Sequence, residues 1–175
     1  IMAKVYLRPL VKEDITETYL SWFKDKMVSK FLDVDGYSLN KNIVLEYIQN
    51  GKTSKSYFMY AICLKENDKH IGNLKIGPIR YKHMLSDFIT VIGDKTQWHK
   101  GIATESIKLG IELAFKKYNI RKLSAKISSA NIGSINAYTK AGFTIEGSLK
   151  DQLMIGNEFQ DEILVGCYNH NFKSK

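Results

Sequence analysis

The stretch from Leu85 to Tyr118 constrains the fold of this chain more than any other. An apolar run, Leu85–Ile92, has the composition of a β-strand and stops at Gly93. After a polar loop, a helical pattern opens at Lys100-Gly101-Ile102-Ala103 and continues to Tyr118. A further β-type run, Leu123–Ile127, follows this helix. A strand, a crossover helix and a second strand favour parallel pairing of the two strands in one sheet.

The start of this predicted helix has the features of an anion-binding site. Gly101 and Ala103 are small, so a ligand can approach the backbone closely. The first N–H groups of a helix have no partner within it, and the helix dipole and Lys100 add positive charge. We therefore expect a phosphate or diphosphate here. A glycine that merely begins a helix packed against a sheet is the alternative interpretation of these few residues.

Local patterns outside this unit predict the remaining elements. Strand-like runs lie at residues 4–8, 57–64, 71–76, 143–149 and 163–168. Helical patterns lie at residues 13–24, 38–51 and 131–142, and Ser38 is the expected cap of the second. The early strands follow one another as hairpins, and the last two form an antiparallel pair. With no repeat, linker or low-complexity tract, residues 4–170 are expected to form one α+β domain.

Composition narrows the functional classes. The chain has 175 residues and a net charge of +8, but its 26 Lys and Arg are spread among acidic residues, which argues against nucleic-acid binding. No apolar run approaches the ~20 residues of a membrane span, and no signal-peptide pattern is seen, so a cytoplasmic protein is expected. Cys63 and Cys167 lie far apart in apolar runs and predict reduced core thiols, with neither disulfide nor metal.

A second motif lies about thirty residues beyond Gly101. Asn131 precedes Tyr138 by seven residues, and Gly142-Phe143 follows four residues later. Together with Trp98-His99-Lys100-Gly101-Ile102-Ala103, this pattern resembles the GNAT superfamily of N-acetyltransferases, and within it the ribosomal-protein-alanine and spermidine acetyltransferases. The resemblance implies a mostly antiparallel sheet of six to seven strands with a splayed parallel pair, flanked by about four helices.

The resemblance also implies acetyl-CoA as co-substrate and assigns residues to it. The N–H groups from Lys100 to Thr104 would hold the diphosphate, and the backbone of Val91 to Gly93 would run along the pantetheine arm. Ile92 would offer an N–H to the thioester oxygen, and Tyr138 would be the general acid, although a core tyrosine is the alternative. Asn131 would cap its helix or bind the pantetheine amides. The residues expected at the coenzyme are Val91, Ile92, Gly93, His99, Lys100, Gly101, Ile102, Ala103, Thr104, Asn131 and Tyr138.

The general base is less clearly indicated by the sequence. Some members of the family have Glu five residues before the Asn, where this chain has Lys126. Asp87, on the strand that leads to the site, is the first candidate. Weaker candidates are Glu105, Glu158, Asp161 and His83. A water relay, or an amine that arrives neutral, would make a side-chain base unnecessary.

Two functions from different classes follow. The first is acetyl transfer from acetyl-CoA to a primary amine, either of a small molecule such as an amino sugar or of a protein N-terminus. The positive net charge disfavours a polyamine. The second is a non-catalytic acyl-CoA-binding module with the same fold. The expected partners are acetyl-CoA and the amine, without nucleic acid or membrane, and monomer and homodimer stay open.

Overall fold

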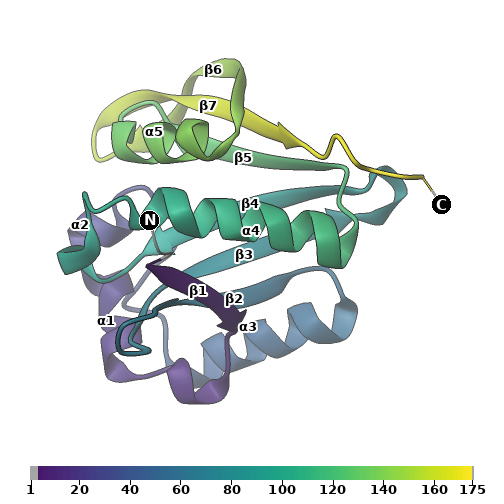
Figure 1. Cartoon of the computed structure of the whole chain (residues 1–175). Coiled ribbons are helices and arrows are strands. Elements are labelled where there is room, and N and C mark those ends of the chain that lie inside the picture. Colours follow the sequence, from purple (N-terminus) through teal and green to yellow (C-terminus); the bar gives the residue numbers. More distant parts are fainter. Residues whose placement is uncertain (1–3, 175) are drawn as a thin grey trace.

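One seven-stranded sheet organises the chain (Figure 1). A computed structural model describes residues 4–174. The strands lie in the order β1-β2-β3-β4-β5-β7-β6. All neighbours are antiparallel except β4 and β5, which are parallel. The strands are β1 (Val5–Pro9), β2 (Phe58–Leu64), β3 (His70–Arg80), β4 (Leu85–Ile92), β5 (Lys122–Ser128), β6 (Thr144–Ile155) and β7 (Glu158–Tyr168). The predicted mixed sheet with one parallel pair is confirmed.

Residues 4–174 contain the four predicted helices and a fifth that the sequence did not predict. The α-helices are α1 (Glu17–Lys24), α2 (Lys26–Ser29), α3 (Lys41–Ser54), α4 (Ile102–Tyr118) and α5 (Ile132–Ala141). Three 3-10 turns, η1 (Lys12–Asp14), η2 (Tyr81–His83) and η3 (Lys95–Gln97), complete the set. The unexpected helix, α2, has one turn and is too short to show a helical period.

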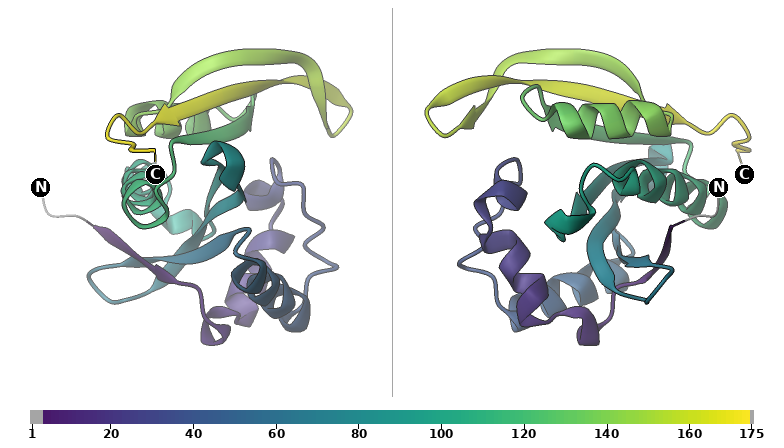
Figure 2. Two further views of the ribbon diagram at one scale, coloured as in Figure 1. Left: turned by 90° about the vertical axis from the view of Figure 1, so that its right-hand side faces the viewer. Right: turned by 60° about the vertical axis from the view of Figure 1, so that its left-hand side comes forward.

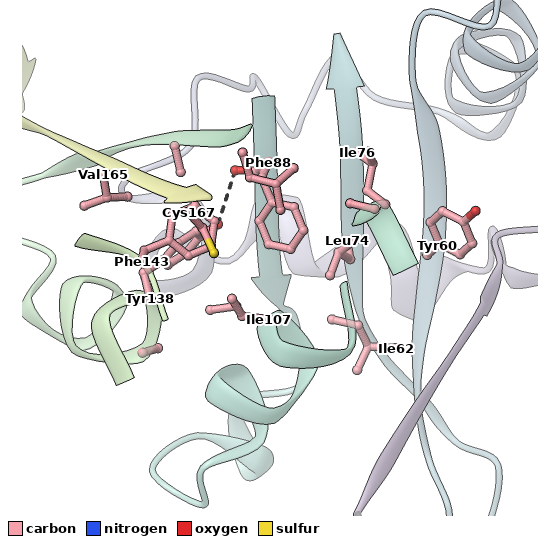
Figure 3. Close-up of a cluster of buried hydrophobic side chains, with 14 of the residues drawn as sticks. Tyr60, Ile62, Leu74, Ile76, Phe88, Ile107, Tyr138, Phe143, Val165 and Cys167 are labelled. Carbon is pink, nitrogen blue, oxygen red and sulfur yellow. Dashed lines mark hydrogen bonds between the residues drawn. The ribbon is translucent and has the colours of Figure 1, made fainter. Parts of the chain in front are cut away.

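The helices cover the sheet from both sides (Figure 2). On one face α4 and α5 pack on a core that includes Leu74, Ile76 and Phe88 (Figure 3). On the other face α1 and α3 pack on a second core that includes Ala61 and Cys63 of β2. Successive side chains of a strand point to opposite faces, so burial on both sides explains the continuous apolar runs of the central strands.

The parallel pair separates soon after it begins. Leu85–Asp87 of β4 pairs with Lys122–Ser124 of β5, and no further pairs follow. β5 instead pairs with β7 over its whole length, from Lys122 to Ser128. From Phe88 to Ile92, β4 therefore has β3 on one side and no strand on the other. Figure 1 shows the two strands diverging toward the end of β4 that leads to α4.

Several element boundaries differ from the sequence prediction. Asn40 rather than Ser38 caps α3, because its side chain accepts the Ile43 N–H at 3.0 Å. The last two strands are also longer than the predicted runs at 143–149 and 163–168. Most of β6 is exposed and a bulge interrupts its register between Leu149 and Leu153, so no apolar alternation marks its second half.

The two cysteines and the buried apolar residues of the helices pack within this fold. Cys63 and Cys167 are free and buried, as the sequence predicts. Within residues 4–174, none of the helices combines the length and the apolar character required to span a membrane.

Candidate active site

The N-terminus of α4, residues 101–104, presents backbone donors, and we call it the mouth of the helix. Gly101 is its N-cap in the left-handed region, with φ 79°, and makes no side-chain cap. The first hydrogen bond of the helix runs from the Glu105 N–H to the Gly101 carbonyl, at 3.1 Å. The N–H groups of Ile102–Thr104 precede this bond and have no acceptor within the helix. Because the Ile102 side chain is only 2% exposed, it anchors this first turn in the core.

Contacts with the start of the chain hold this mouth in place. The Glu105 carboxylate accepts the N–H groups of Lys4 and Val5 at 2.6 and 3.0 Å. The Lys4 ammonium also donates to the Lys100 carbonyl at 3.1 Å. Glu105, one of the weaker base candidates, thus joins β1 to α4. His99 and Lys100 are exposed beside the mouth, and His99 also has a positive φ, 61°.

The end of β4 is fixed by two tryptophans. The Trp22 ring lies against Gly93 so closely that a Cβ there would be 2.1 Å from a ring carbon. The Trp98 indole N–H donates to the Ile92 carbonyl at 2.9 Å. Only glycine permits the first contact, which explains the glycine at this position. Trp22 is buried, in agreement with the usual burial of large aromatic residues.

Backbone groups along β4 alternate between its two neighbours. The Gly93 N–H donates to the Ile71 carbonyl of β3 at 2.9 Å. In an antiparallel ladder successive residues point to opposite sides, so Val91 and Gly93 face β3, whereas Phe88, Thr90 and Ile92 face the gap left by β5. Of the backbone donors expected at the coenzyme on this strand, the Ile92 N–H is the one directed into the gap.

Tyr138 reaches the same gap from α5. Asn131 caps this helix by accepting the Ser134 N–H at 3.2 Å, and its amide nitrogen is not used in the cap. The Tyr138 ring is 4% exposed and packs edge-on against Phe88 and Phe143. Its hydroxyl donates to the Phe88 carbonyl at 3.3 Å, the dashed line of Figure 3. The phenol therefore lies at the point where β4 and β5 separate.

Burial keeps the Tyr138 phenol protonated. Desolvation raises its pKa to about 12, and the proximity of the Thr90 side chain and backbone offsets part of this effect. The Tyr138 proton is thus retained at neutral pH and is available for donation.

Asp87 lies at the point where β4 and β5 separate, which we call the vertex, and its side chain is on the face of the sheet opposite to α5. It is the last residue of β4 that pairs with β5, opposite Ser124. Because Phe88 points into the core under α4 and α5, the Asp87 side chain points to the opposite face, where it is exposed. The Asp87 side chain and the Tyr138 hydroxyl therefore lie on opposite faces of the sheet, at the neighbouring residues Asp87 and Phe88 of β4.

We call the surface around Asp87 the open face. It comprises the side chains of Asp87, Ile89, Ser124, Lys126 and Leu164, on β4, β5 and β7. Its edge carries an ion-pair cluster in which the Glu146 carboxylate accepts from Lys122 at 2.7 Å and from Tyr168 at 2.5 Å.

Two other carboxylates near the open face, Glu146 and Glu162, already have partners. Hydrogen bonds from Lys122 and Tyr168 lower the pKa of Glu146, so it stays ionised within the cluster. Lys126 lies 3.9 Å from Glu162 across the β5–β7 ladder. No local sequence pattern indicates these pairs, because their members are 22 to 36 residues apart in strands with no motif.

The other base candidates lie elsewhere. Asp161 accepts the Asp151 N–H at 2.9 Å and stabilises the bulge of β6. His83 lies in η2, between β3 and β4, and Glu158 lies at the turn of the β6–β7 hairpin. The structure thus brings Asp87, but none of these three, to the vertex beside Tyr138.

Comparison with protein families identifies this architecture. Residues 4–144 match the model of the acetyltransferase (GNAT) domain. The chain belongs to the GNAT acetyltransferase family. Its members use acetyl-CoA, and this GNAT protein is an N-acetyltransferase, as its two sequence motifs predicted.

Relatives of this GNAT acetyltransferase include several bacterial proteins. A probable N-acetyltransferase of Bacillus subtilis (strain 168), YjcK, is 24% identical over 174 residues, which cover 94% of each chain. The spermidine N(1)-acetyltransferase of Escherichia coli (strain K12) is 28% identical over 101 residues, covering 58% of this chain and 54% of that protein.

Solved structures share the fold of this GNAT acetyltransferase. The spermidine N-acetyltransferase of Vibrio cholerae, crystallised with CoA and spermine, superposes with a TM-score of 0.87 at 18% identity, over 98% of this chain and 99% of that one. The ribosomal-protein-S5-alanine acetyltransferase of Vibrio fischeri gives a TM-score of 0.82 at 20% identity, over 99% and 98%. These structures confirm the predicted fold.

Proposed function

We propose that this chain transfers the acetyl group of acetyl-CoA to the primary amine of a small metabolite of the amino-sugar type, rather than to a polyamine. The observation that carries the proposal is the arrangement at the vertex of β4 and β5. A carboxylate, Asp87, lies on one face, and a protonated phenol, Tyr138, lies on the other. An amine and a thiol bound at this point would thus have two different groups, on opposite faces of the sheet, with which to exchange protons.

The coenzyme side has the donors that acetyl-CoA requires. The N–H groups of Ile102–Thr104 and the ammonium of Lys100 suit a diphosphate. From Phe88 to Ile92, β4 has no strand partner on the side of β5, and the pantetheine arm carries amides that can bond to the free backbone groups in this gap. The Ile92 N–H is directed into this gap and would stabilise the thioester oxygen as negative charge develops on it.

Asp87 on one face of the sheet and Tyr138 on the other would carry out the two proton transfers of the reaction. Asp87 would accept a proton from the amine as its nitrogen attacks the carbonyl carbon. When the carbon–sulfur bond breaks, the electron pair passes to sulfur and Tyr138 would donate its proton to the sulfur atom. Solvent would then return a proton to Tyr138 and take one from Asp87, so that both groups are restored.

Charge on the open face supports the choice of acceptor. A polyamine is bound by uncommitted carboxylates, but Glu146 is engaged by Lys122 and Tyr168, and Glu162 lies beside Lys126. Lys126 itself is 63% exposed on this face. An amine whose remaining groups are neutral or anionic therefore fits this surface better than a polycation.

An amine panel tests the proposal. Thiol release from acetyl-CoA is measured with hexosamines and their phosphates, with a peptide bearing an N-terminal alanine, and with spermidine. We expect the highest kcat/KM with an amino sugar. Faster turnover of spermidine or of the peptide would overturn the proposed acceptor. Stabilisation by CoA without turnover of any amine, and with no effect of Tyr138→Phe, would instead support a non-catalytic module.

A further inference from the structure

Thr90 places an unpartnered hydroxyl in the middle of the gap. It lies on β4 between Phe88 and Ile92 and directly opposite Leu74 of β3, whose side chain is in the core under α4 and α5. The Thr90 side chain therefore points to the face from which Tyr138 approaches. Its Oγ1 is buried and makes no hydrogen bond with any residue of the described chain.

Packing does not explain a threonine at this position. A buried hydroxyl without a partner destabilises a protein, and valine has the same shape without that cost. The hydroxyl thus has no role in the fold that valine would not fill better. Such a group points to a partner that forms only during binding or turnover.

The Tyr138 hydroxyl is the polar group beside it. The Thr90 side chain and backbone lie close enough to this phenol to lower its pKa against the effect of burial, although the Thr90 hydroxyl forms no hydrogen bond in this structure. The backbone alternation of β4 also turns the Thr90 N–H to the same side as the Phe88 carbonyl to which Tyr138 donates. One residue therefore offers two donors to one phenol oxygen.

Proton donation by Tyr138 creates a need for such donors. The Phe88 carbonyl, which accepts from the phenol at 3.3 Å, is an acceptor only and would repel a phenolate. A phenolate left in this buried site without donors would be costly, and that cost would raise the barrier to proton donation. The hydroxyl and the N–H of Thr90 can supply the missing hydrogen bonds.

We propose that Thr90 is a positioning residue for Tyr138, and that its hydroxyl and N–H donate to the phenolate formed when the Tyr138 proton passes to the departing CoA sulfur. This inference rests on the proposed function, in which Tyr138 is the general acid. It adds a residue that the sequence motifs did not include, because Thr90 lies in the apolar run of β4 rather than in a loop.

Four variants test the role of Thr90. Thr90→Val removes only the hydroxyl, Thr90→Ser retains it, and both are also made in the Tyr138→Phe background. We expect Thr90→Val to lower kcat about tenfold, the range for a lost hydrogen bond to a charged group, with the KM for acetyl-CoA changed less than about twofold. Thr90→Ser should restore most of kcat. In the Tyr138→Phe background, Thr90→Val should have no further effect.

A matched control is Thr139→Val. Thr139 lies beside Tyr138 on α5 and its hydroxyl donates to the Ile135 carbonyl of its own helix at 2.9 Å. Its loss should leave kcat within about twofold, since such a backbone contact adds little.

Each other outcome has a distinct meaning. Equal losses from Thr90→Val with and without the Tyr138 hydroxyl would overturn the proposal, as would an unchanged kcat or a failure of Thr90→Ser to restore it. These results leave the proposed function intact as long as Tyr138→Phe itself lowers kcat. If Tyr138→Phe matches the unmodified enzyme, the general-acid assignment fails and the role of Thr90 fails with it. Thermal unfolding with and without CoA shows that every variant is folded and binds.

Discussion

The two sides of the sheet at the β4–β5 vertex present different kinds of functional group: backbone groups on one side and side chains on the other. On the coenzyme side, the donors are backbone groups of α4 and of β4, and the buried side chain of Ile102 holds the first turn of α4 in the core. On the open face, the functional groups are side chains, and several are paired across strands, as Glu146 is with Lys122.

This difference distinguishes the coenzyme site, which depends on backbone geometry, from the acceptor site, which depends on individual side chains. Backbone donors depend on φ, ψ and close approach, so a few glycines suffice to form a diphosphate site. Side-chain recognition depends on which residues meet across strands, and it can change without altering the fold. The coenzyme side therefore identifies the family, whereas in the proposed function the open face would select the amine.

Loss of the Tyr138 hydroxyl should have the largest effect, because it lies where the two sides meet. We expect Tyr138→Phe to lower kcat about 10³-fold, within the usual range for a general acid, with little change in CoA affinity. Thiol-release kinetics and a CoA thermal shift measure the two quantities. A loss of CoA binding equal to the loss of kcat would show that the hydroxyl serves the binding site instead.

Asp87→Asn tests the open face at the vertex. At neutral pH we expect kcat/KM for the amine to fall about 10²-fold. The loss should shrink as the pH rises, because more of the amine then arrives without its proton. Asp151→Asn is the matched control, since Asp151 is exposed on the β6 bulge with φ 50°, which Asn tolerates. A loss that is the same at every pH would argue against a base at Asp87.

Gly101→Ala tests the backbone site. A side chain at φ 79° costs about 1–2 kcal/mol and projects toward the diphosphate, so we expect acetyl-CoA to bind about tenfold more weakly. Gly142→Ala is the control, because Gly142 has φ 120° and open space around its Cβ position but ends α5. Both variants should lose stability, and only the first should lose coenzyme affinity in calorimetry. Equal affinities would contradict the assignment.

Lys126→Glu should have the smallest effect and act on the acceptor alone. Exposed charges contribute little, so we expect the KM for an anionic amino-sugar phosphate to rise about threefold and that for spermidine to fall by a similar factor. Lys65→Glu, in the exposed β2–β3 turn, changes the net charge equally and serves as the control. If both variants shift the two KM values alike, the effect is that of overall charge.

Local patterns allowed much of the fold to be predicted. The strand, loop and helix from Leu85 to Tyr118 and the helix that begins at Asn131 are predictable, because glycine, capping and apolar periodicity act within a few residues. Tyr138 was indicated by the resemblance to the family. The prediction missed α2 and the second half of β6, where a one-turn helix and an exposed strand leave no periodic signal.

The sequence by itself determined the order of the elements, the parallel pair and the glycine that opens α4, because these depend on neighbouring residues. Only the tertiary structure decided that β5 leaves β4 after Asp87 and that Thr90 faces Tyr138. It also decided that lysines form ion pairs with Glu146 and Glu162 near the open face. Such contacts join residues tens of positions apart, and packing between strands and helices, rather than local conformational preference, determines which of them meet.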